Sequence, residues 1–255
     1  MSDFDHIEAL SFDCYGTLID WETGIADTLA PWAKRRAVTV EPDDLVAAFA
    51  RHESVVETEH PDWLYPSILA ETMGRIGRDL GVEVNEIEGQ AFGRSVGLWP
   101  AFADTAPALA QLASRFKLII LSNVDRVSFR QSNDRFGLEF DLVITAEDVG
   151  AYKPSAANFD ALEQGLASLG IERQHLLHVA ESLYHDHVPA RGRQLSTAWI
   201  HRRHDKDGFG ATATPADAVE PNWRFTSMAE LAAACTGVVS KPHPVSRREP
   251  PRPRS

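Results

Sequence analysis

Residues 9–20 read ALSFDCYGTLID, and this stretch decides the fold. Its opening apolar run is typical of a buried strand, and Gly16 then lets the chain turn sharply. The carboxylate of Asp13 therefore stands at the end of a strand. Thr17, four residues later, supplies a hydroxyl that can hydrogen-bond this carboxylate or a ligand. We predict that Asp13 is a catalytic residue; the alternative is that it only caps the turn.

Four further apolar runs predict strands, and helical patterns separate the later ones. The five predicted strands are Ala9 to Cys14, Leu118 to Ser122, Leu142 to Thr145, Leu176 to Ala180 and Thr197 to His201. Apolar residues at helical spacing predict helices at Thr105 to Phe116 and Asn158 to Leu169. This alternation indicates an α/β fold with a Rossmann-like, mostly parallel sheet. Ligands of such sheets bind beyond the carboxyl ends of the strands.

The segment between the first two predicted strands lacks this alternation and is too long for an ordinary connection. Its helical patterns lie at Asp43 to Val56 and Ser67 to Leu80. We therefore predict a helical cap inserted into a catalytic core. The predicted boundaries are 23–97 for the cap, 1–22 and 98–236 for the core, and 237–255 for a proline-rich, disordered tail.

Charge and composition exclude several classes of protein. The formal net charge of the 255 residues is −12, although residues 241–255 hold five Lys/Arg and one Glu. This acidic balance argues against a nucleic-acid partner. No apolar run approaches the roughly 20 residues that span a bilayer, and the first residues lack the order of a secretion signal. We expect a cytoplasmic protein without a membrane partner.

Neither cysteine is predicted to carry chemistry. Cys14 lies in the first apolar run and Cys235 in an alanine-rich, helix-like segment. No CxxC pattern is present, so the sequence indicates neither a zinc site nor a disulfide framework. Cys14 as a nucleophile is the alternative, but no histidine adjacent in the sequence supports it, and Asp13 beside it is the better candidate.

Three more polar groups follow the predicted strands or the loops beside them. The run LIILSNV ends in Ser122 and Asn123, two small hydrogen-bond donors. In GAYKPSAANF, Lys153 precedes a proline that suits the start of a helix, although a lone lysine is usually a solvated surface charge. In LLHVAESLYHDHVPA, Glu181 and Asp186 follow a strand. These two acids can bind a metal, orient Lys153 or cap the next helix.

Together and in this order, the four motifs resemble the haloacid dehalogenase superfamily, over about residues 8 to 233. The resemblance implies a Rossmann-like core with a cap. It also implies that Asp13 is the nucleophile, that Ser122 is a ligand-binding hydroxyl, and that Lys153 holds the nucleophile and the substrate oxygens.

The position two residues after Asp13 separates two branches of this superfamily. Its phosphatases carry a second Asp there as general acid and base, and they need Mg²⁺. Here the position is Tyr15, whose phenol, with an ordinary pKa of about 10, is a poor proton shuttle at neutral pH. The string D-x-Y-G-T-L is similar to the type II (L-)2-haloacid dehalogenases, which use no cofactor. This implies hydrolysis of carbon–halide bonds in short 2-haloalkanoic acids through an aspartyl ester.

Such a displacement needs donors for the substrate carboxylate and the departing halide, and an apolar surround for the reacting carbon. We expect Thr17 and Ser122 to bind the carboxylate and Asn123 to meet the halide. The remaining substrate- and halide-binding candidates are Tyr15, Trp21, Arg51 and Ser182.

Three departures from the dehalogenase pattern affect these assignments. The resemblance implies an arginine in the cap that cradles the halide; Arg51 is the nearest candidate, and a solvated helix arginine is the alternative. A tyrosine of the family is replaced by Phe159, which loses a hydroxyl. The acids Glu181 and Asp186 keep a phosphatase-like spacing. We favour one of them as an orienting partner of Lys153 rather than a Mg²⁺ ligand.

Two alternative functions remain open from the sequence. A Mg²⁺-dependent phosphatase acting on a small phosphomonoester is motivated by the two acids after the fourth strand. A non-catalytic interaction protein is motivated by the basic tail. The expected partner is a small anionic carboxylate substrate, and the resemblance implies a possible homodimer. Among the histidines, His178 is expected in the core, whereas His185 and His187 are candidates for the edge of the active site.

Overall fold

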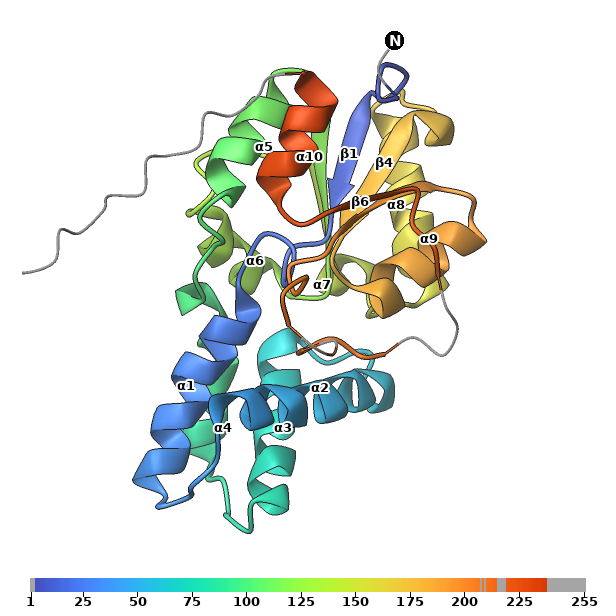
Figure 1. The fold of residues 1–255 in the computed structure, drawn as a ribbon. Coiled ribbons are helices and arrows are strands. Elements are labelled where there is room, and N and C mark those ends of the chain that lie inside the picture. The colour runs from blue at the N-terminus through green and yellow to red at the C-terminus, as the bar shows by residue number, and fades with distance from the viewer. Residues whose placement is uncertain (1–2, 207, 209, 215–218, 238–255) are drawn as a thin grey trace, which may run out of the picture.

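The computed structural model of the chain describes residues 3–206, 208, 210–214 and 219–237. Within these residues, one sheet contains six strands in the order β3-β2-β1-β4-β5-β6, and every neighbouring pair is parallel (Figure 1). The strands are β1 Ala9–Phe12, β2 Lys117–Ser122, β3 Leu142–Thr145, β4 Leu176–Ala180, β5 Ser196–Ile200 and β6 Trp223–Phe225. The α/β fold with a parallel sheet is thus confirmed.

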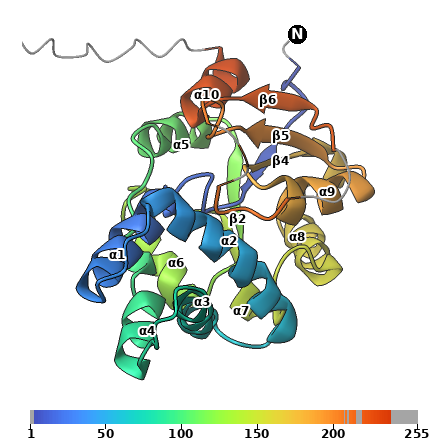
Figure 2. The ribbon, with the colours of Figure 1, turned by 60° about the horizontal axis from the view of Figure 1, so that its bottom comes forward.

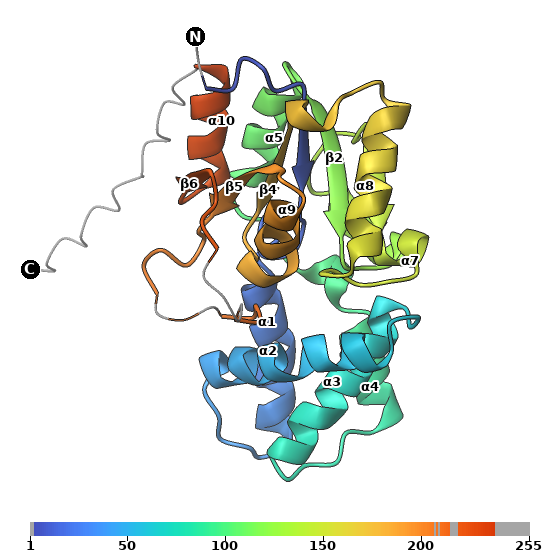
Figure 3. The same ribbon diagram turned by 90° about the vertical axis from the view of Figure 1, so that its right-hand side faces the viewer.

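Both faces of the sheet are covered by helices (Figure 3). Because side chains alternate between the faces of a strand, β2 sends Leu118 and Ile120 into one core and Ile119 and Leu121 into the other. The first core includes side chains of α5 Thr105–Ala113 and α10 Met228–Thr236. The second includes side chains of α8 Ala156–Ser168 and α9 Val188–Gly192.

Four helices between β1 and β2 form a separate layer, which we call the four-helix unit: α1 Trp21–Arg35, α2 Pro42–Glu59, α3 Tyr65–Asp79 and α4 Glu86–Gly93. The unit lies at the carboxyl ends of the strands, and α2 runs across these ends (Figures 1 and 2). Polar caps begin two of its helices, because Asp20 accepts from Thr23 N at α1 and Asn85 from Glu88 N at α4. The domain boundaries predicted at 22/23 and 97/98 stay a prediction.

The smaller elements connect these layers. They are the short turns η1 Val96–Leu98, η2 Arg173–His175 and η3 Leu183–His187, and the helices α6 Arg126–Asn133 and α7 Ala146–Val149. No helix among the described residues is long and apolar enough to cross a bilayer.

The predicted bounds of β3 and β4 match the structure, whereas those of β1, β2 and β5 differ. β1 ends at Phe12, because the carbonyl oxygen of Cys14 accepts bonds from the backbone N–H groups of Leu18 and Ile19 and closes a turn. The sequence did not predict β6, α6, α7 or α9, whereas the alanine-rich, helix-like segment around Cys235 is α10. The predicted disordered tail lies, after residue 237, outside the described residues.

We expect Gly24→Ala to destabilise the fold, because a Cβ at Gly24 in α1 would lie 2.2 Å from Cγ of buried Trp99. Overpacking costs about 1–3 kcal/mol, which outweighs the roughly 1 kcal/mol that alanine gains over glycine in a helix. The matched control is Gly74→Ala in α3, where the nearest atoms are the side-chain ends of Arg78 and Glu71 at 3.7 and 3.9 Å. This control should keep or raise the free energy of unfolding in urea. Equal effects of the two substitutions would contradict the packing argument.

Candidate active site

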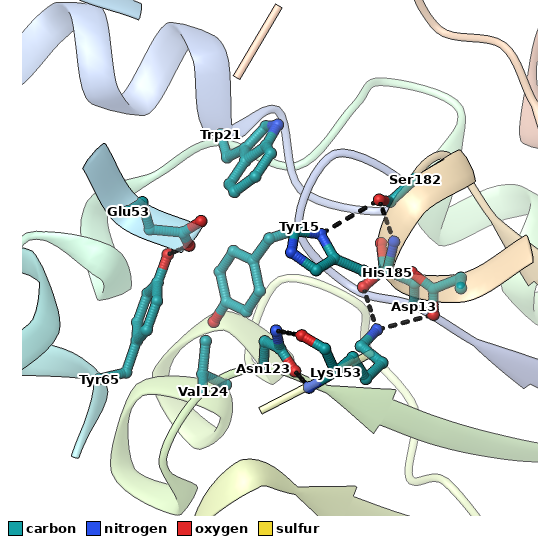
Figure 4. A pocket seen from close by; sticks show the side chains of 11 residues that line it. Asp13, Tyr15, Trp21, Glu53, Tyr65, Asn123, Val124, Lys153, Ser182 and His185 are labelled. Atoms are coloured by element: carbon teal, nitrogen blue, oxygen red, sulfur yellow. Dashed lines mark hydrogen bonds and ion pairs between the residues drawn. The ribbon is translucent and has the colours of Figure 1, made fainter. Parts of the chain in front are cut away.

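The ammonium of Lys153 lies buried between two carboxylates. Its Nζ donates to Asp13 Oδ1 at 2.9 Å, to Asp186 Oδ1 at 2.8 Å and to the carbonyl oxygen of Leu121 at 2.9 Å (Figure 4). These bonds use all three donors of the ammonium. Burial alone would lower the pKa of Lys153, but the charges of Asp13 and Asp186 outweigh it and hold that pKa above its ordinary value. The group is therefore a fixed positive charge.

Asp13 is held from three directions at the end of β1. Its backbone N–H donates to the carbonyl oxygen of Val179 at 3.0 Å. Thr17 Oγ1 donates to Asp13 Oδ2 at 2.7 Å and accepts from the backbone N–H of Glu181 at 2.8 Å. Gly16, with φ +91°, makes the tight turn that brings Thr17 back to Asp13. Burial raises the pKa of Asp13, and the charge of Lys153 opposes this effect.

Asp186 carries the second carboxylate at Lys153. Its Oδ1 also lies 3.0 Å from His178 Nε2, and His178 Nδ1 lies 2.8 Å from Ser11 Oγ. Burial opposes ionisation of Asp186, but Lys153 and His178 prevail and lower its pKa well below the ordinary value. Asp186 Oδ2 is buried and has no hydrogen-bond partner among the described residues. His178 is a fully buried strand residue that also holds the carboxylate in place.

Glu181 does not pair with Lys153. Its Oε2 accepts from Thr212 Oγ1 at 2.8 Å, on the side of the turn where Gly16 lies. Burial raises the pKa of Glu181 to about 8, and the nearby charge of Asp13 adds to the shift. Of the two acids after β4, only Asp186 contacts the lysine.

Asn123 fixes the loop that carries Lys153. Its Oδ1 accepts from the backbone N–H of Lys153 at 2.6 Å, and its Nδ2 donates to the carbonyl oxygen of Lys153 at 3.1 Å. The same Nδ2 lies 3.3 and 3.4 Å from the carboxylate oxygens of Glu57. The Oγ of Ser122, in contrast, is buried without a hydrogen-bond partner among the described residues.

Two aromatic side chains, Tyr15 and Trp21, line the cavity beside Asp13. The hydroxyl of Tyr15 is hydrogen-bonded to Ser132 Oγ at 2.8 Å, and burial keeps its pKa well above the ordinary value. It therefore stays a neutral phenol. Burial likewise raises the pKa of Cys14, so the thiol next to Asp13 is protonated and is no competing nucleophile.

Arg51 does not reach the cavity, and its prediction as a halide-binding residue is wrong. Its side chain is 60% exposed and lies 3.4 Å from Asp79. Phe49, Glu53 and Glu57 are buried on the inner face of α2. Residues two positions apart on a helix do not share a face, so Arg51 points away from the residues that meet the core.

Glu53, Glu57 and Tyr65 were not predicted as site residues, yet all three lie at the cavity or next to it. Burial raises the pKa of Glu53 to about 7 and that of Glu57 well above its ordinary value. The signal in the sequence was the spacing of Phe49, Glu53 and Glu57, which places two acids in the apolar stripe of a helix.

A small cavity joins these groups at the carboxyl ends of the strands (Figure 4). Its volume is about 30 Å³, so it suits a small ligand. The cavity brings together most of the predicted site residues. It is lined by Asp13, Tyr15, Trp21, Glu53, Tyr65, Asn123, Val124, Lys153, Ser182, His185 and Asp186.

Comparison with known proteins gives consistent matches. A family model described as haloacid dehalogenase-like hydrolase matches residues 7–183. An (S)-2-haloacid dehalogenase of Pseudomonas sp. (strain YL) is 26% identical over 239 residues, which cover 88% of this chain and 92% of that protein. The (S)-2-haloacid dehalogenase H-109 of Pseudomonas putida is 26% identical over 223 residues, or 82% of this chain and 92% of its own.

The fold is also that of solved dehalogenases. The structure of L-2-haloacid dehalogenase from Xanthobacter autotrophicus with chloropropionic acid covalently bound has a TM-score of 0.73 and 22% identity, and the match covers 91% of this chain and 99% of that one. The family model spans well over half of the chain, including the turn after β1, the loop of Lys153 and the strand before Asp186. The protein therefore belongs to the haloacid dehalogenase-like hydrolases.

Proposed function

We propose that this hydrolase releases halide from short 2-haloalkanoic acids, with Asp13 as the nucleophile. The observation that carries the proposal is the Asp13 carboxylate, held by Lys153 and Thr17 on the wall of a small cavity, with Tyr15 instead of a second acid two residues later. The curated relatives named as 2-haloacid dehalogenases support this substrate class.

In the first step, an oxygen of Asp13 attacks the carbon that bears the halogen. A carbon–oxygen bond forms, the carbon–halogen bond breaks, and the halide leaves with the electron pair. Lys153 favours the ionised nucleophile, and Tyr15 and Trp21 provide an apolar wall near the reacting carbon. Ser122 Oγ, which has no partner among the described residues, is available to the substrate carboxylate if the side chain turns toward the cavity.

In the second step, water cleaves the ester at the carbonyl carbon of Asp13. The products are the 2-hydroxyacid and a proton, and the Asp13 carboxylate is regenerated. Asp186 can orient this water, because its Oδ1 is fixed by Lys153 and His178 whereas its buried Oδ2 has no partner in the described part of the chain. We assign to Asp186 the role of accepting a hydrogen bond from the attacking water.

The phosphatase alternative requires Mg²⁺ between the carboxylates after β1 and β4. The residues do not fit this ion, because the ammonium of Lys153 already bridges Asp13 and Asp186 at 2.9 and 2.8 Å. Glu181 bonds Thr212 instead of turning toward Asp13. Tyr15 also offers no second acid for proton transfer. We therefore assign no cofactor to the displacement at Asp13. The cytoplasmic location and the homodimer stay predictions.

We expect Asp13→Asn to abolish steady-state halide release, because an amide is a far weaker nucleophile than a carboxylate. Single turnover of the wild type in H₂¹⁸O with a panel of short 2-haloacids should place the label in the Asp13 side chain. Peptide mass spectrometry measures its position. Label only in the hydroxyacid product of a single turnover, with none in Asp13, would contradict the ester mechanism. Phosphate release from small monoesters, dependent on Mg²⁺ and on Asp13, would favour the phosphatase.

We expect Asp186→Asn to slow ester hydrolysis more than ester formation, because the proposed acceptor for the attacking water is lost. The ester should then accumulate on Asp13 and appear as added mass on the intact protein after mixing with substrate. Ser11→Ala, which removes only the hydroxyl beside His178, is the control and should accumulate far less. A variant that loses both steps equally, with no adduct, would remove Asp186 from this role.

We expect Glu181→Gln to flatten the dependence of stability on pH. Folded Glu181 keeps its proton to about pH 8, whereas its ordinary pKa is 4.5. The folded state therefore binds more protons between these values, and its stability falls as pH rises through that window. Glutamine has no proton to lose and keeps the acceptor for Thr212. Urea unfolding from pH 4.5 to 8 measures the difference; parallel profiles of the two proteins would show that Glu181 is ionised throughout.

A further inference from the structure

Three potential metal ligands meet where the four-helix unit faces the core. Glu53 and Glu57 stand one turn apart on α2, so their carboxylates share a face. His185 of η3 faces them from the core, and its Nε2 lies 3.9 Å from Glu57 Oε2. One ligand atom of each residue lies within 4.8 Å of the other two. The three residues are only 3%, 4% and 6% exposed.

The imidazole of His185 is oriented toward this cluster. Its Nδ1 lies 3.1 Å from Ser182 Oγ, whereas its buried Nε2 has no hydrogen-bond partner among the described residues (Figure 4). Burial lowers the pKa of His185 to about 4, so the ring is neutral at physiological pH. When Nδ1 carries the proton and donates a hydrogen bond to Ser182 Oγ, Nε2 presents a free lone pair to the two carboxylates.

The carboxylates lack a protein cation of their own. No Lys or Arg in the described ranges forms an ion pair with Glu53 or Glu57, and the ammonium of Lys153 is already shared by Asp13, Asp186 and a carbonyl group. Burying two ionised carboxylates without a cation is costly. Carboxylate oxygens and imidazole nitrogens are, however, both ligands that divalent transition metals such as Zn²⁺ accept.

Each of the three side chains is also held by a separate partner. Tyr65 donates to Glu53 Oε1 at 3.1 Å, Asn123 Nδ2 lies within hydrogen-bond reach of Glu57, and Ser182 contacts His185. Partners of this kind fix the orientation of metal ligands and tune their affinity. We propose that Glu53, Glu57 and His185 form a binding site for a divalent transition-metal ion such as Zn²⁺, with open positions toward the cavity.

Such an ion would act at a different place from the nucleophile. It would join α2 to η3 and so tie the four-helix unit to the core. Glu53 and His185 line the same cavity as Asp13, so the ion would also stand beside the space where an anionic substrate enters. The inference goes beyond the proposed function and holds whether or not the chain releases halide.

The test uses the full-length protein, stripped of metal with EDTA and then titrated with Zn²⁺ by calorimetry without substrate. We expect one tight site per chain and a rise in Tm on binding, because a ligand that binds only the folded state stabilises it. Glu57→Gln and His185→Gln should each weaken binding by more than about 100-fold, since loss of a ligand exceeds the effect of losing its orienting partner.

His52→Gln is the matched control. His52 and Asp79 form an exposed histidine–carboxylate pair 2.7 Å apart, with His52 on the same helix as the two acids, and this change should leave the tight site intact. Absence of tight Zn²⁺ binding by the wild type would overturn the proposal. So would binding that survives in both Glu57→Gln and His185→Gln. Halide release is measured separately, so failure of the dehalogenase assignment leaves this result readable.

Discussion

The site depends on the hydrogen bonds and ion pairs that the buried ammonium of Lys153 makes. A single charge contacts Asp13 after β1, the backbone of Leu121 in β2 and Asp186 after β4, and so ties the carboxyl ends of three neighbouring strands. These two ion pairs, of Lys153 with Asp13 and with Asp186, are not a large net source of folding stability, because the cost of desolvating the charges offsets their attraction. Loss of one partner is costly, however, since it leaves a buried charge uncompensated. The value of the arrangement lies in fixing where a carboxylate stands and how it is charged.

Much of this arrangement could be predicted from the sequence because it is local to the strands. An apolar run followed by a polar residue predicts both a buried strand and a group at its carboxyl end, which is how Asp13 and Asn123 were found. The same logic gave β3 and β4 their observed bounds. β6 was not predicted, because Trp223–Phe225 is only three residues long and partly buried, and so contains no apolar run that would indicate a strand.

The site residues of the four-helix unit were harder to predict, because they depend on which face of α2 meets the sheet. Glu53 and Glu57 are acids in the buried stripe of α2, and because acids are ordinarily solvated, the sequence did not single them out as site residues. Arg51 was predicted as a halide-binding residue from its position in the sequence. In the folded helix its side chain lies on the solvent face, next to Asp79. Tertiary packing decides which face of a helix meets the core. A resemblance confined to motifs at strand ends gives no information about that packing.

The same rule that explains Lys153 also explains the acids opposite it. A buried negative charge needs either a proton or a cation, and Lys153 is already used by Asp13 and Asp186. Burial raises the pKa of Glu53 to about 7 and that of Glu57 well above its ordinary value, so without an added cation protons offset part of the charge of these acids. A divalent ion at Glu53, Glu57 and His185 would displace these protons, and its two positive charges would balance the two carboxylates. The charge of the two acids is therefore balanced either by protons or by a metal ion, and only a metal ion would offer a carboxylate substrate an open coordination position.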